Sequence, residues 1–148
     1  MTAGTKKVYP GELATPYQVH MLAHEYRNAA IHLASLGRSR EPLSRAPFRL
    51  AAIHAIELYL NAFLLKRGHP ASEIRSLQHN LAERVKLSAS YGLQLRAKTT
   101  QHINDLAENR EYVITRYGPE MTSSASQLNR LTATMEEVML KVSKLMAV

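Results

Sequence analysis

The sequence predicts an all-α fold, and three observations lead to this prediction. Apolar residues recur at three- and four-residue steps in several segments, which places them on one face of a helix. The segment from Leu50 to Leu65 is apolar at thirteen of its sixteen positions, so we expect a helix that other elements surround. The alternation that marks a strand is missing from the sequence. We therefore expect one domain over residues 1–148, an up-and-down bundle of four to five helices.

Composition limits the class of protein. A chain of 148 residues can bury its own core, and an apolar content of 45% excludes general disorder. The lack of cysteine excludes disulfides, thiolate metal sites and cysteine nucleophiles. No apolar run follows Lys6 and Lys7, so we expect no secretory signal. The one long apolar segment is interrupted by polar residues, so we expect no membrane span and a cytoplasmic location.

The first helix has a clear start. Residues 1–14 lack periodicity and are expected to be a loose N-terminal arm. Thr15, Pro16 and Gln18 then match an N-cap, a proline at the first helical position and a capping box. We expect Gly37 to end this helix. Its predicted apolar stripe comprises Val19, Leu22, Tyr26, Ala30, Leu33 and Leu36.

The second helix is predicted from roughly Pro47 to Arg67, between an opening proline and the closing Gly68. Its three polar residues, His54, Glu57 and Asn61, are spaced i, i+3, i+7. They therefore form one polar line on a single face of an otherwise apolar helix.

Three more segments complete the expected bundle. A third helix over Ser72 to Ser88 contains Asn80, which can serve as a second cap and break it there. A fourth helix is predicted from about Leu93 to Tyr112, and Ser123 or Ser124 is expected to cap the last one. The last helix has an apolar stripe of Leu128, Leu131, Met135, Val138, Val142 and Leu145.

The charge favours polyanionic ligands. Lys plus Arg outnumber Asp plus Glu by 19 to 12, and the net charge of +7 favours association with RNA or DNA. A local excess occurs at Arg38, Arg40, Arg45 and Arg49. A basic surface without a ligand remains the alternative.

Several motifs resemble a known family. The segment Ala51 to Leu65, then Gly68, then His79-Asn80-Leu81, then Arg116-Tyr117 resembles the HEPN domain (higher eukaryotes and prokaryotes nucleotide-binding). That family has A-x-E-x-x-L-K-A-x-L in its second helix, G…H-[ND]-L in its third and RY at the end of its fourth. The resemblance covers about residues 16–146. It implies an up-and-down bundle, usually a homodimer, without a cofactor.

The HEPN family includes metal-independent ribonucleases of toxin and antiviral systems, nucleotide-binding accessory modules and inactive relatives. Its ribonucleases carry R-x(4–6)-H, in which the arginine neutralises the scissile phosphate and the histidine transfers a proton. This sequence departs from that pattern, since Thr115, Arg116 and Tyr117 stand five to seven residues after Arg110. No histidine follows Arg116. The resemblance therefore implies a divergent member and, if the chain is an enzyme, a degenerate ribonuclease.

Three residues are candidates for catalysis: Arg110, His54 and Glu57. Arg110 falls on the apolar stripe of the fourth helix, so we expect it to lie inside and pair with Glu57. Such a pair would either fix the register of two helices or form part of a phosphate site. His54, one turn from Glu57, is expected to have its charged form favoured and to act as a general acid or base.

A second group would bind RNA or a nucleotide. The tyrosine beside Arg116 can stack on a base, whereas the His79-Asn80 pair alternatively caps a helix. His20 and His24 lie one turn apart but lack a third ligand, so we expect no metal site. The binding group comprises Asn61, His79, Asn80, Arg116 and Tyr117.

Two functions follow as hypotheses. In the first, a cleft between the second and fourth helices binds RNA or a nucleotide. In the second, the chain is a non-enzymatic dimeric module in a defence or toxin–antitoxin pair. Its partner would then be a nucleotidyltransferase-type protein, and the Glu57–Arg110 pair would be structural.

Overall fold

The computed structural model describes residues 8–124 and 127–147, and regular secondary structure in this part of the chain is entirely helical. The predicted all-α class is therefore confirmed. The elements are α1 (Pro16–Ala34), η1 (Pro42–Arg45), α2 (Ala46–Lys66), α3 (Ala71–Ser76), α4 (Leu81–Ser90), α5 (Ala97–Glu108), α6 (Glu111–Tyr117), η2 (Pro119–Ser124) and α7 (Leu128–Met146), where η1 and η2 are 3₁₀ helices.

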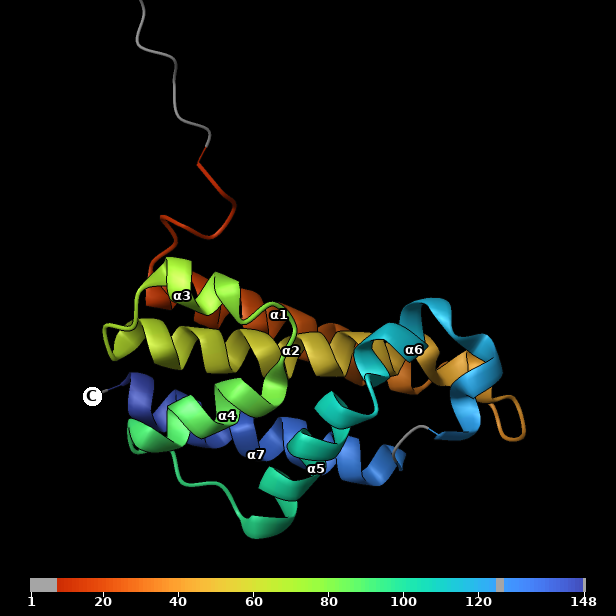
Figure 1. Cartoon of the computed structure of the whole chain (residues 1–148). Coiled ribbons are helices and arrows are strands. Elements are labelled where there is room, and N and C mark those ends of the chain that lie inside the picture. Colours follow the sequence, from red (N-terminus) through yellow and green to blue (C-terminus); the bar gives the residue numbers. More distant parts are fainter. Residues whose placement is uncertain (1–7, 125–126, 148) are drawn as a thin grey trace, which may run out of the picture.

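Helix α2 is the centre of the fold. Figure 1 shows it running along α1, with α4 and α7 on its other side. Tyr59, Phe63 and Ile56 of α2 are completely buried. By length and composition, the segment Pro42–Lys66 could cross a membrane, yet 72% of its most apolar window is buried within the fold. The apolar character of this segment therefore matches that of a core helix.

Helix α1 starts as predicted but packs differently. The Thr15 side chain accepts a hydrogen bond from the Gln18 N–H, and the Gln18 side chain accepts one from the Thr15 N–H, so the capping box is confirmed. The buried residues are Ala23 and Ala30. Leu22, Tyr26 and Leu36, which the predicted stripe placed inside, are exposed. The two alanines let α1 approach α2 closely, which leaves larger side chains on the flanks.

The predicted third helix is broken, as Asn80 indicated. Helix α3 ends before a linker, Leu77–Asn80, and the Asn80 side chain caps α4 by accepting the Glu83 N–H at 3.1 Å. Gln78 makes the bend with a φ of 51°, a left-handed conformation that is uncommon for residues other than glycine.

The predicted fourth helix is also broken, which the sequence did not indicate. Arg110 has a φ of 52° and separates α5 from α6. The periodicity that buries Ile103 and Leu106 is therefore not continued to Arg110, and this arginine is exposed. The prediction that Arg110 lies inside was wrong. After the break, Glu111 and Ile114 are the buried residues instead.

The last helix begins later than expected. Gln127 is its N-cap, so the predicted cap at Ser123 or Ser124 was wrong, because η2 continues to Ser124. The apolar stripe is confirmed, since its four central members are buried and its two ends are packed against the core. Of the predicted N-terminal arm, residues 1–7 lie outside the described part, and residues 8–14 contain turns and no helix.

His102 gives the fold a pH dependence. It is 5% exposed on α5, and its Nδ1 lies 2.7 Å from Thr134 Oγ1 on α7. Burial is the main reason why the pKa of His102 falls from 6.5 to about 4. Between these values the unfolded chain binds a proton that the folded chain excludes, so lowering the pH favours unfolding.

We therefore expect acidification to reduce stability. Going from pH 7 to pH 5 should lower the free energy of unfolding by about 2 kcal/mol through His102. Urea unfolding at both pH values measures this effect. The His102→Gln variant has no titrating group at this position, so its free energy of unfolding should fall correspondingly less between pH 7 and pH 5. An equal fall in both proteins would show that His102 is not the source of the pH dependence.

Candidate functional site

The polar line of α2 borders a large groove. The groove lies between α1, α2, α3 and residues 9–14 of the arm, and its volume is ≈ 750 Å³. All three predicted polar residues of α2 line it. We name it the α2 groove, and the residues that matter below are His54, Glu57, Asn61, His79 and Arg84.

Glu57 is hydrogen-bonded to one histidine and lies near a second. It is 7% exposed, and its Oε1 accepts a hydrogen bond from His79 Nδ1 at 3.0 Å. Its Oε2 lies 3.8 Å from His54 Nδ1. The predicted pair of Glu57 with Arg110 is therefore wrong. The break before α6 leaves Arg110 on the surface, whereas the α3–α4 linker brings His79 to the carboxylate.

His79 stands between two hollows. Its side chain is 51% exposed, and the Nδ1 bond to Glu57 leaves its Nε2 available for another group. The ring stacks on Tyr112 with a centroid distance of 4.1 Å and an interplanar angle of 23°. Besides the α2 groove, His79 lines a hollow of ≈ 580 Å³ together with Asn80, Arg110 and Tyr112, which we name the α5–α6 hollow.

Arg116 extends this arrangement to the surface. Its guanidinium lies 5.2 Å from the ring centre of Tyr112 and 5.3 Å from that of Tyr117, and it donates a hydrogen bond to the Tyr112 hydroxyl. Tyr117 is itself exposed. A cation, an aromatic ring, an imidazole and a buried carboxylate thus follow one another from surface to core.

His54 differs from its expected charge state. Its ring meets Tyr26 edge-on at 4.5 Å. Burial lowers the pKa of His54, and although Glu57 raises it, His79 and Arg116 lower it further. The expectation that Glu57 favours charged His54 was therefore wrong, because desolvation outweighs the carboxylate. The lowered pKa favours the neutral imidazole, in which one ring nitrogen can accept a proton and the other carries an N–H.

Arg84 is the residue that the sequence analysis missed. It is 2% exposed on α4, and its Nε donates to Asn61 Oδ1 at 2.7 Å. Its terminal nitrogens donate to the carbonyl oxygens of Asn80 at 3.3 Å and Ile74 at 3.4 Å. Burial lowers the pKa of Arg84 and nearby Glu57 raises it. Arg84 therefore supplies the buried cation that was expected of Arg110.

A signal for Arg84 exists in the sequence. It lies between Leu81 and Val85 at the spacing of one helix face, so an inward arginine could have been inferred. The side chains of Asn61 and Asn80 are engaged in holding Arg84 and in capping α4. Of the predicted binding residues, His79, Arg116 and Tyr117 are the exposed ones with side chains open to a ligand.

The histidine pair of α1 is bound within the protein. The rings of His20 and His24 lie 4.4 Å apart. His24 Nδ1 is 2.7 Å from the Tyr59 hydroxyl, and His20 Nε2 is 3.0 Å from Ser143 Oγ. Among the described residues, no group of three or more histidine, aspartate or glutamate side chains is arranged to hold a metal ion.

Comparison with models of known protein families, with curated proteins and with solved structures finds no match for this chain. The case for a function therefore rests on the residues around Glu57 and His79.

Proposed function

We propose that this chain is a HEPN-like helical bundle that binds RNA or a nucleotide across the α2 groove and the α5–α6 hollow. One observation supports this above all. The imidazole of His79 lines both hollows, is hydrogen-bonded to Glu57 and stacks on Tyr112, which also contacts Arg116.

Each part of this arrangement suits a nucleotide. The guanidinium of Arg116 can pair with phosphate oxygens, and it lies beside the exposed ring of Tyr117, on which a base can stack. The net charge of +7 adds a general attraction for a polyanion.

The same residues support metal-independent cleavage of RNA. With its Nδ1–H donated to Glu57, His79 carries a lone pair on Nε2 that can take the proton of a ribose 2′-hydroxyl. The 2′-oxygen then bonds to the adjacent phosphorus, and the bond from phosphorus to the 5′-oxygen breaks. The 5′-oxygen leaves with the proton that His79 took up, and Arg116 offsets the charge of the phosphate. The products would carry a 2′,3′-cyclic phosphate and a 5′-hydroxyl.

Labelled RNA tests this proposal. Fluorescence anisotropy at about 50 and 200 mM salt should show binding that weakens steeply with salt. Gel analysis in the presence of a chelator should show fragments that end in a cyclic phosphate. Failure of the full chain to bind RNA or a nucleotide at the lower salt would overturn the proposal.

Arg110→Gly should separate stability from binding. Arg110 lies at the edge of the α5–α6 hollow in a left-handed conformation that glycine adopts without strain. We expect the variant to be about 1 kcal/mol more stable to urea, because the strain is removed. We also expect the slope of the logarithm of the RNA-binding constant against the logarithm of salt concentration to become smaller by about one unit.

Lys98→Gln is the control for Arg110→Gly. It removes one positive charge from the exposed start of α5, away from both hollows. If Lys98→Gln weakens RNA binding as much as Arg110→Gly does, the effect of Arg110 reflects net charge rather than a contact.

A second function is favoured by the surface of α1. Tyr17, Met21 and Ile31 are large apolar side chains that are exposed on this helix. Such a surface suits a protein interface, in a homodimer or with a nucleotidyltransferase-type partner. Light scattering that gives twice the mass of one chain, together with no RNA binding, would favour this function over the first.

A further inference from the structure

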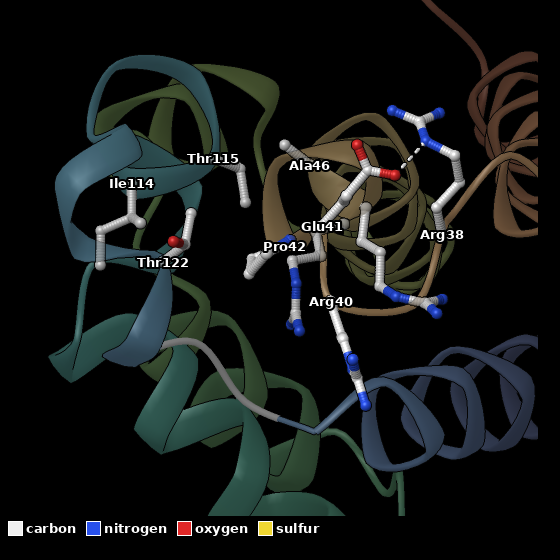
Figure 2. Close-up of a pocket in the computed structure, with 10 residues that line it drawn as sticks. Arg38, Arg40, Glu41, Pro42, Ala46, Ile114, Thr115 and Thr122 are labelled. Carbon is white, nitrogen blue, oxygen red and sulfur yellow. Dashed lines mark hydrogen bonds and ion pairs between the residues drawn. The ribbon is translucent and has the colours of Figure 1, made fainter.

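A pocket at the start of α2 gathers four arginines. Its volume is ≈ 200 Å³, and it shares no lining residue with the α2 groove or the α5–α6 hollow. Figure 2 shows Arg38 and Arg40 on one side, with Ile114, Thr115 and Thr122 opposite. We name it the arginine pocket, and its charged residues are Arg38, Arg40, Glu41, Arg45 and Arg49.

The loop that carries Arg38 and Arg40 is held in one shape by hydrogen bonds to Glu41 and to Ser44 of η1. Ser44 Oγ accepts the Arg38 N–H at 2.7 Å and donates to the Glu41 carbonyl oxygen at 2.6 Å. The Glu41 N–H donates to the Arg38 carbonyl oxygen at 3.2 Å. Arg40, between them, has a φ of 64°, which costs energy for every residue except glycine. An arginine is thus kept where glycine would be favoured.

Arg45 has a fixed place over the same loop. A Cβ atom on Gly37 would lie 2.6 Å from Arg45 Nη1, so the guanidinium passes directly over this glycine. In the described part of the chain, Arg40 and Arg45 form no ion pair. Both guanidinium groups therefore have charge available for an anion.

The other two arginines, Arg38 and Arg49, each form an ion pair with a carboxylate. Arg38 Nε donates to Glu41 Oε2 at 2.7 Å, and Arg49 Nη1 lies 4.0 Å from Oε1 of the buried Glu111. Four guanidinium groups thus face two carboxylates, which leaves two positive charges in excess. Burial lowers the pKa of Arg49, Glu111 raises it and Arg45 lowers it. A bound anion would therefore offset the free-energy cost of keeping the half-buried Arg49 charged.

We infer that the arginine pocket binds a phosphate dianion, either free or as the terminal phosphate of a nucleotide or oligonucleotide. Two excess charges match a dianion, and the planar guanidinium suits the oxygens of phosphate. The facing wall of Ile114, Thr115 and Thr122 carries no charge that would repel it. A volume of ≈ 200 Å³ admits a phosphate group and leaves the nucleoside outside. The inference does not depend on the proposed function, because the two sites share no residue.

Calorimetric titration of the full chain at constant ionic strength tests this inference. Inorganic phosphate and pyrophosphate should bind saturably, and chloride should not compete. A 5′-phosphorylated dinucleotide and its dephosphorylated form then distinguish the two sources. Tighter binding of the phosphorylated dinucleotide than of free phosphate identifies a terminal phosphate as the ligand. Equal or weaker binding identifies free phosphate.

Arg40→Gly is the decisive variant, because glycine accepts the left-handed conformation and only the guanidinium is lost. Its affinity for phosphate should fall at least tenfold. Lys98→Gln is the control, since it removes one positive charge from an exposed residue outside the arginine pocket. No phosphate binding by the unmodified chain would overturn the inference. So would an equal affinity in Arg40→Gly, or an equal loss in both variants. RNA binding by Arg40→Gly tests the proposed function separately.

Discussion

His79→Asn is expected to slow RNA cleavage by about 10²- to 10⁴-fold while the chain still folds. The Nδ2 of asparagine can occupy the place of imidazole Nδ1 and keep the bond to Glu57, whereas Nε2, the atom that we propose takes the proton, is lost. Single-turnover cleavage of labelled RNA measures the rate, and urea unfolding measures the free energy of unfolding. RNA affinity should change little, because the proposed phosphate contact is made by Arg116.

His32→Asn is the matched control for His79→Asn. His32 is exposed in the last turn of α1, and it lines neither the α2 groove nor the α5–α6 hollow. Its variant should cleave RNA at the rate of the unmodified chain. If His79→Asn also cleaves at that rate, His79 does not transfer the proton, and the cleavage part of the proposed function fails.

Arg84→Met is expected to cost about 3–5 kcal/mol of stability. Methionine fills much of the same space but donates nothing to Asn61 or to the carbonyl oxygens of Ile74 and Asn80. It also leaves the buried Glu57 without its nearby arginine. Urea unfolding measures the loss, and the melting temperature should fall by roughly 10 °C.

Arg75→Met controls for the loss of an exposed arginine. Arg75 lies on the surface of α3, where its guanidinium packs over the Tyr9 ring at 4.3 Å. Its removal should cost less than about 1 kcal/mol. Equal losses in Arg84→Met and Arg75→Met would show that the hydrogen bonds of Arg84 contribute no more than a surface contact.

Features with local causes could be predicted from the sequence. The extent of α2 follows from its apolar run and from Gly68, whose φ of 85° ends the helix. The cap at Asn80 follows from its side chain, which bonds to the backbone three residues on. The break at Arg110 has no such signal, because arginine rarely adopts a left-handed conformation.

The site could be predicted only in part, because only some of its features have local causes. The spacing of His54, Glu57 and Asn61 placed them on one face, and the structure shows that face at the groove. The partner of Glu57 depends on how the α3–α4 linker bends, which no residue near Glu57 determines. The burial of Glu57 could therefore be predicted from the sequence, but its predicted partner, Arg110, was wrong.

The central position of α2 has a consequence for how the chain is made. One side of α2 is covered by α1, which precedes it, and another by α7, which begins only at Leu128. During synthesis α2 is therefore complete long before Leu131, Met135 and Val138 exist to cover it. Until then its apolar side is open to other chains, so we expect aggregation to be most severe for nascent chains that lack α7.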